Sequence, residues 1–273
     1  MTAPGRTPKE SGTPSLVSAG AVVDPPVAVY ATRLGDDTLI LAQRLGGWIT
    51  NAPQLEEDVA LANLGLDLLG QARMLLTYAG EREGLGRDED DLAYSRDERG
   101  FCNVTLVERA DADFGEAMAR LLVFSVYQLL LYDRLSASTD PTLAAIAAKA
   151  VKEVAYHRDH ATQWVLRLGD GTPESHRRMQ AGVDCVWPHV DELFETDDLE
   201  RALVAEGVAV DRPGLRAEWE SYVRDVLTRA TLTVPEPAAA PVTGGRAGVH
   251  TEAMGYLLAE LQHLVRSHPG ATW

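Results

Sequence analysis

Glu153 and His157 are the two residues whose types and spacing best suit metal chemistry. They lie four positions apart in a predicted helix, so their side chains point in the same direction. A carboxylate and an imidazole that point into the interior of a helical bundle are either ligands of a metal ion or partners in a buried polar contact. The first interpretation predicts a catalyst, and the second predicts a support for one.

A di-iron or di-manganese centre in a ferritin-like bundle needs a Glu on each of two helices and Glu-x-x-His on each of the other two. Polar residues lie in the corresponding helices of this chain, at Gln43, Asp67, Gln71, Asp133, Glu153 and His157. The set departs from the motif, because the first helix has an amide, the second has Asp-x-x-x-Gln, and the fourth has Glu-x-x-x-His. Neutral amides are poor ligands for a charged two-metal centre. We predict that these are polar core positions of a vacated metal site, and that the chain binds no metal or other cofactor.

An alternative hypothesis stays open, in which the chain is an independent di-metal oxidase or oxygenase that uses Asp67, Asp133, Glu153 and His157. Metal content of the isolated chain would separate the two hypotheses. Other catalytic signals are missing, since the sequence has no Gly-rich phosphate loop, no paired-cysteine zinc motif and no nucleophile elbow.

The only literal Glu-x-x-His pattern joins Glu260 and His263 near the C-terminus. It stands alone, and a two-residue pattern arises readily by chance in a Glu-rich chain. We interpret it as a surface or interface pair, and we expect His160 to be solvated or interfacial as well.

Four long helices are predicted from apolar residues that recur at helical spacing. They span residues 26–49, 54–81, 113–137 and 141–170. Asp140 is a good N-cap for the last of them, and Pro141 suits the first helical position, where its missing N–H costs nothing. The short break at 50–53 predicts an antiparallel hairpin, and the long connection at 80–113 is either a crossover to a second hairpin or a surface for a partner or ligand. This order is typical of a ferritin-like four-helix bundle, so the predicted fold class is all-α.

Two glycines interrupt the second predicted helix. Gly65 and Gly70 each lower helix stability, by roughly 1 kcal/mol relative to Ala. We interpret them as marks of a close approach by a neighbouring helix.

Additional C-terminal helices are predicted at about 172–190, 199–206, 215–232 and 251–267. A stretch rich in Pro, Ala and Gly at 234–248 separates the last two and is predicted to be a mobile connection. Residues 1–25 lack periodicity and are predicted to form a disordered tail. The remainder, 26–273, is predicted to be a ferritin-like domain with a core bundle over about 26–170 and accessory helices over about 172–267.

The composition excludes several classes of partner. The net charge of −16 disfavours binding to nucleic acid or to an anionic membrane surface. No uninterrupted apolar run approaches the roughly 20 residues that cross a membrane. Cys102 and Cys185 lie far apart without metal-type spacing, which predicts reduced thiols in a cytoplasmic protein.

Several long segments carry a resemblance to a known family. They are LGDDTLILAQRLGGW, LEEDVALANLGLDLLGQARMLLTYAGE, DDLAYSRDERGF, AAIAAKAVKEVAYHRDHATQWVLRLGDGT and TGGRAGVHTEAMGYLLAEL. Over about Arg33 to Trp273 the chain closely resembles the C subunit of the bacterial phenylacetyl-CoA epoxidases. The resemblance implies a place in a multicomponent oxygenase of phenylacetate breakdown. There the catalytic A component carries the di-iron centre, the small B component joins the assembly and a flavin/iron–sulfur reductase delivers electrons, while the C component is a structural partner.

The resemblance also implies that phenylacetyl-CoA comes near this chain, because its anchoring can be shared across a subunit interface. The candidate contacts are Arg99, Gly100, Phe101, Asn103 and Arg201. Arg supplies charge-assisted contacts, Asn and backbone N–H groups supply donors, and Phe101 could pack on adenine or pantetheine. The competing interpretation is that Arg99, within an acidic stretch, pairs with a neighbouring carboxylate.

Overall fold

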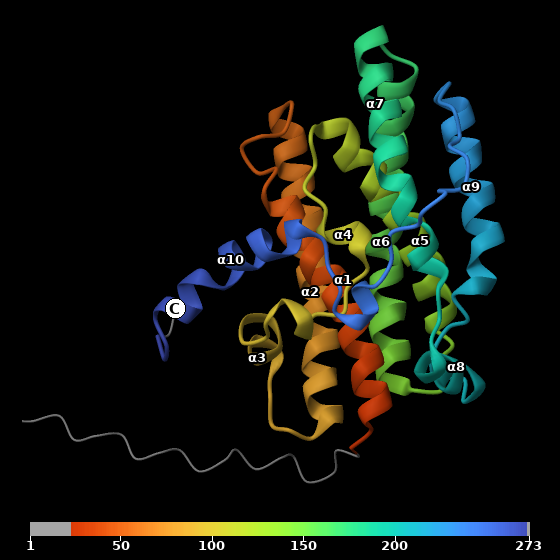
Figure 1. Cartoon of the computed structure of the whole chain (residues 1–273). Coiled ribbons are helices and arrows are strands. Elements are labelled where there is room, and N and C mark those ends of the chain that lie inside the picture. The colour runs from red at the N-terminus through yellow and green to blue at the C-terminus, as the bar shows by residue number, and fades with distance from the viewer. Residues whose placement is uncertain (1–22, 272–273) are drawn as a thin grey trace, which may run out of the picture.

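The computed structural model describes residues 23–271, which form ten α-helices joined by loops and short 3₁₀ turns, and no β-strand (Figure 1). The predicted all-α class is confirmed. The tail predicted over residues 1–25 falls almost wholly outside the described residues, and Pro25 already begins the first helix.

Four long helices form the core bundle: α1 (Pro25–Gly46), α2 (Leu55–Glu83), α5 (Phe114–Leu135) and α6 (Pro141–Gly169). α1 packs along α2, and α5 packs along α6, so the chain forms two antiparallel hairpins as predicted. The predicted bounds differ from the observed ones by only a few residues. α1 ends earlier than predicted because Gly46 and Gly47 disfavour the helix.

The start of α6 follows directly from its sequence. The Asp140 carboxylate accepts hydrogen bonds of 3.0 Å from the backbone N–H groups of Thr142 and Leu143, and Pro141 occupies the first turn. One face of the helix is buried against the bundle, and its apolar members are Leu143, Ile146, Ala147, Ala150, Val154, Ala161 and Val165. Near the end of α6 a Cβ at Gly169 would lie 2.4 Å from the Ala230 carbonyl oxygen, so this close approach requires glycine.

The crossover between the hairpins is more ordered than the sequence pattern predicts. It contains α3 (Glu89–Tyr94), a 3₁₀ turn η1 (Glu98–Gly100) and α4 (Thr105–Glu108). Two adjacent buried carboxylates of α1 hold it in place. Asp36 forms an ion pair with Arg96 and accepts a 2.9 Å hydrogen bond from the Cys102 N–H, while Asp37 accepts one of 2.8 Å from the Val104 N–H.

The accessory helices are α7 (Pro173–Val186), α8 (Asp198–Ala205), α9 (Arg216–Arg229) and α10 (Glu252–Ser267). The helix predicted over 172–190 ends at Val186, because Pro188 lies in a following 3₁₀ turn, η2 (Trp187–His189). α7 and α9 pack on α5 and α6 (Figure 1). The buried Trp219 indole of α9 donates a 2.9 Å hydrogen bond to the Val123 carbonyl oxygen of α5, which fixes α9 to the bundle.

The segment before α10 is anchored inside the fold, so the prediction of a mobile connection over 234–248 is wrong at its C-terminal end. The Arg246 guanidinium donates to both carboxylate oxygens of Asp37, at 3.0 and 2.7 Å, and to the Cys102 carbonyl oxygen at 2.7 Å. The Glu192 carboxylate accepts from the N–H groups of Gly244 and Gly245. Composition indicated flexibility here, but these buried charge contacts outweigh it.

His250 adds a further anchor to that segment. Its Nδ1 lies 2.7 Å from a carboxylate oxygen of Glu108, and its Nε2 lies 3.0 Å from the Phe101 carbonyl oxygen. Burial alone would lower the pKa of His250, but the Glu108 hydrogen bond and charge outweigh burial and raise that pKa. Because both ring nitrogens face acceptors, the imidazolium form fits this position.

Candidate functional site

Three polar side chains from three helices form a hydrogen-bonded chain where the bundle would hold metals. The Gln71 amide of α2 donates to the Glu153 carboxylate of α6 at 3.0 Å, and its oxygen accepts from the Gln128 amide of α5 at 3.1 Å. Gln71 and Gln128 are buried, and Glu153 is half-buried. One carboxylate and two neutral amides therefore share this layer.

His157 and Asp67 form the next layer, one helical turn away. The His157 Nε2 lies 3.1 Å from a carboxylate oxygen of Asp67, whose side chain is 37% exposed. Burial lowers the pKa of His157, and the hydrogen bond to Asp67 only partly opposes that shift. The neutral imidazole therefore carries its proton on Nε2, which leaves Nδ1 as a buried base with no hydrogen-bond partner among residues 23–271.

The carboxylate positions of the di-metal motif hold apolar residues. Glu-x-x-His places the Glu three residues before the His. The residues three before Gln71 and His157 are Leu68 and Val154, and both are completely buried. Within the described part of the chain, no group of three or more His, Cys, Asp or Glu side chains is arranged to hold a metal ion.

The structure brings together four of the six predicted positions, and it leaves two apart. Asp67, Gln71, Glu153 and His157 lie along the contact between α2 and α6. Gln43 of α1 is half-buried and makes no hydrogen bond to them in the described structure.

The prediction that Asp133 belongs to the polar core is wrong. Its side chain is 61% exposed and pairs with the neighbouring Arg134 at 2.7 Å. The α5 side chains that reach this polar layer are instead Gln128 and Tyr132, which lie one turn apart and contact each other at 3.4 Å. Gln128 was detectable, because it is an isolated amide within the apolar run LLVFSVYQLLLYD.

Gln71→Ala is expected to destabilise the fold by about 2 kcal/mol, because it leaves the buried Gln128 amide with only its 3.4 Å contact to Tyr132 and opens a small cavity. Urea unfolding followed by circular dichroism measures the change. Gln43→Ala is the matched control, and its effect should stay below about 0.5 kcal/mol because that amide makes no hydrogen bond to the other described residues. Equal effects of the two substitutions would contradict the network described here.

The candidate CoA contacts do not form a common site within this chain. Phe101 is completely buried with the Arg96 guanidinium 4.1 Å from its ring centroid, so it cannot pack on a substrate. Asn103 is also buried, and its amide donates to Glu108 at 2.9 Å, so it is not free to bind a ligand. The prediction is wrong for both residues, because tertiary contacts fold this segment inward.

The other three candidates are nearer the surface. Arg99 and Gly100 are exposed, and the Gly100 carbonyl oxygen accepts a hydrogen bond from Arg96. Arg201 lies on α8 and pairs with Asp198 at 2.5 Å. Among the described residues no hydrogen bond or ion pair joins Arg201 to the segment 99–103. The structure therefore does not join these two parts of the predicted CoA site.

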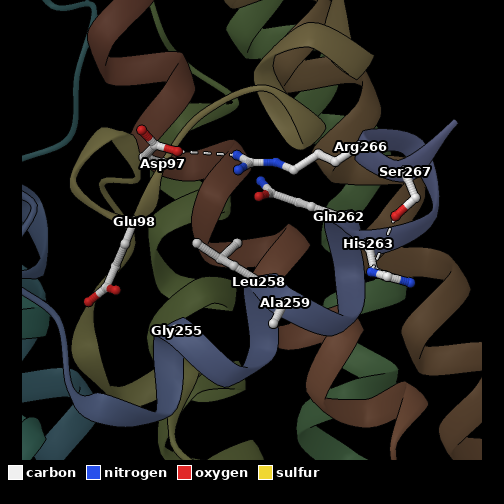
Figure 2. A pocket seen from close by; sticks show the side chains of 9 residues that line it. All are labelled: Asp97, Glu98, Gly255, Leu258, Ala259, Gln262, His263, Arg266 and Ser267. Carbon is white, nitrogen blue, oxygen red and sulfur yellow. Dashed lines mark hydrogen bonds and ion pairs between the residues drawn. The ribbon is translucent and has the colours of Figure 1, made fainter. Parts of the chain in front are cut away.

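A groove of about 450 Å³ lies beside this segment, between α10 and the turn η1 (Figure 2). Figure 2 shows Arg266 directed at Asp97, and the two charges are 3.3 Å apart. Asp97 and Glu98 make one wall acidic, which opposes the binding of CoA phosphates. His263 lines the same groove and contacts Ser267 at 3.4 Å, and among the described residues no hydrogen bond joins it to Glu260.

An all-α bundle of two hairpins joined by a crossover, with a polar layer at its centre, defines a ferritin-like protein. Residues 19–273 match the family model described as phenylacetic acid catabolic protein, and the chain belongs to that family. It is also 49% identical over 247 residues to the C subunit of the 1,2-phenylacetyl-CoA epoxidase of Escherichia coli (strain K12). That alignment covers 90% of this chain and 99% of the relative.

Proposed function

We propose that this chain is the non-catalytic structural subunit of a phenylacetyl-CoA epoxidase in aerobic phenylacetate catabolism, and that it stabilises a di-iron catalytic subunit in the cytoplasm. The observation that carries the proposal is the burial of Leu68 and Val154 at positions where a di-metal bundle needs carboxylates. The similarity to a relative named as the C subunit of such an enzyme supports the same conclusion.

The physical advantage of such a partner lies in the chemistry of the catalytic bundle. Several carboxylates must be held close together around two metals, and rigid support keeps them in place. A bundle whose own interior holds the neutral Gln71 and Gln128 amides, hydrogen-bonded to each other, can supply that support. The small B component and, indirectly, the reductase complete the assembly, while nucleic acid and membrane are not partners.

Substrate contact by this chain is a smaller part of the proposal. Of the predicted CoA contacts, Arg99 is an exposed cation with no ion pair among the described residues. Its guanidinium could meet a CoA phosphate at an interface, where charge-assisted hydrogen bonds are strong. Arg201 is already paired, and Phe101 and Asn103 are buried.

The second candidate function is an independent di-metal oxidase. It is favoured by the unpartnered Nδ1 of His157, a suitable ligand atom in the bundle interior. The remaining donors do not fit a two-metal centre, because Asp67 is engaged with Nε2, Glu153 is bonded to Gln71 and Asp133 is exposed.

Metal analysis with co-purification tests the proposal. After growth with added iron and manganese, the isolated chain should contain well below one metal ion per molecule, whereas the co-expressed catalytic subunit should carry iron and remain bound to this chain. His157→Ala is the control, and it should leave metal content unchanged. Stoichiometric metal in the isolated chain that His157→Ala removes would refute the structural role.

A further inference from the structure

One long side of the bundle has no cover within the described part of the chain. α4 and α10 pack over α1, α3 packs over the C-terminal part of α2, and α7 and α9 pack over α5 and part of α6 (Figure 1). The remaining outer sides of α2 and α6 are open and expose large apolar side chains. We call this surface the α2–α6 face, and it contains Leu55, Val59, Leu66, Leu69, Gly70, Lys149, Lys152 and Tyr156.

The apolar residues of α2 form a continuous stripe along this face. Val59, Leu66 and Leu69 are separated by seven and three positions, so they share one side of the helix. They are 56%, 64% and 46% exposed, and Tyr156 on the adjacent α6 is 54% exposed. The most apolar part of α2 is 39% buried, against 83% for that of α5. Such an aligned stripe marks an interaction surface rather than scattered exposed residues.

Gly70 lies beside that stripe, and no contact among the described residues explains why this position is a glycine. A Cβ built there would meet no atom within 4 Å, whereas Gly65 faces the Ala42 carbonyl oxygen of α1 at 3.7 Å. A Cβ at Gly65 would make only ordinary van der Waals contact with α1, so the structure does not require glycine there, and at Gly70 no helix of the described residues approaches. Glycine in a helix lowers stability by about 1 kcal/mol relative to Ala. At Gly70 this loss leaves room for the backbone of another molecule.

The face also carries an unusual pair of positive charges. Lys149 and Lys152 are the only lysines among the described residues of a chain with net charge −16. Both are exposed on α6, and no ion pair among the described residues reaches either of them. The Lys149 Nζ lies 3.8 Å from the Met74 sulfur of α2, which places this charge at the contact between the two helices. An acidic partner surface would complement them.

We propose that the α2–α6 face is the docking surface for the catalytic subunit, which meets it with helices that bear an apolar stripe flanked by acidic side chains. This inference rests on the proposed function. Each 29-residue helix is about 44 Å long. That length suits helix-on-helix packing over a standard interface of roughly 800 Å² per partner. A second copy of this chain fits less well, because two molecules of charge −16 repel each other.

The test measures binding of the full-length chain to the purified di-iron subunit. L66D/L69D should weaken the affinity at least about 100-fold, because it places two charges in the centre of the interface. L264D on α10 is the matched control, since Leu264 is 50% exposed away from the α2–α6 face, and its affinity should stay within about twofold of wild type. Circular dichroism melts should show that both variants remain folded.

Reversing the two lysine charges provides a second test of the docking surface. K149E/K152E should weaken binding about tenfold at low salt, and the loss should shrink at about 0.5 M salt because screening weakens exposed charge pairs. Wild-type binding with no loss in L66D/L69D would overturn the docking surface and leave the proposed function standing. Failure of the wild-type chain to bind the catalytic subunit would overturn both. A dimer of the isolated chain, or its binding to phosphatidylcholine vesicles, that L66D/L69D abolishes would assign the face to another occupant.

Discussion

Asp37→Ala is expected to destabilise the protein by about 3–5 kcal/mol, well above the effect of a typical single substitution. Asp37 is 2% exposed, and it neutralises Arg246 through two hydrogen bonds. Removing the carboxylate leaves a buried guanidinium without a counter-charge and deprives the Val104 N–H of its acceptor. Urea unfolding at neutral pH measures the loss.

Two further variants make this prediction specific. D37L/R246M should be less damaging than Asp37→Ala, because removing both charges avoids an uncompensated ion in the interior. Asp133→Ala, which breaks an exposed ion pair with Arg134, should change stability by less than about 0.5 kcal/mol. A similar loss for Asp37→Ala and Asp133→Ala would contradict the role given to the buried pair.

Acid is expected to destabilise the fold below about pH 6.5, and His189 should account for much of the loss. Burial, assisted by the nearby Arg109 charge, lowers the pKa of His189 to about 4. The unfolded chain therefore binds a proton between about pH 6.5 and 4 that the folded chain does not bind, so stability falls as pH drops through that range. The full difference corresponds to about 3 kcal/mol. The lowered pKa of His157 acts in the same direction.

The geometry around His189 explains why it stays neutral. The Thr105 hydroxyl donates to Glu192 at 2.7 Å, so it accepts from the His189 Nδ1–H at 2.9 Å. The His189 Nε2 then accepts from Arg109 at 3.1 Å, and a second proton would face that guanidinium. Unfolding free energies measured across this pH range should depend less steeply on pH in His189→Gln. An unchanged slope in that variant would show that other groups control the acid response.

The long helices were predictable because residues close together in the sequence determine where each helix forms and where it begins. Apolar residues recur at helical spacing through α2, α5 and α6, and Asp140 with Pro141 marks the start of α6. The short helices α3 and α4 were not predictable in this way. They have six and four residues, too few for a periodic pattern, and long-range hydrogen bonds from the Cys102 and Val104 N–H groups to Asp36 and Asp37 hold their connection in place.

The candidate site was predictable in part for the same reason. Spacing within one helix indicated that Glu153 and His157 share a direction, but it did not show that each bonds to a different residue of α2. Asp133 was misplaced because helix rotation relative to the core is set by packing, which brings Gln128 inward instead. The burial of Phe101 likewise depends on Arg96, which covers its ring.

The contact between Asp37 and Arg246 has a consequence for biosynthesis. The two residues are 209 positions apart, so the ribosome must add all of the intervening residues before the counter-charge of Asp37 exists. Until then the nascent N-terminal hairpin contains an unmatched carboxylate that resists burial. Maturation of the hairpin of α1 and α2 is thereby coupled to translation of the segment that contains Arg246, and a product terminated before that residue would lack this contact.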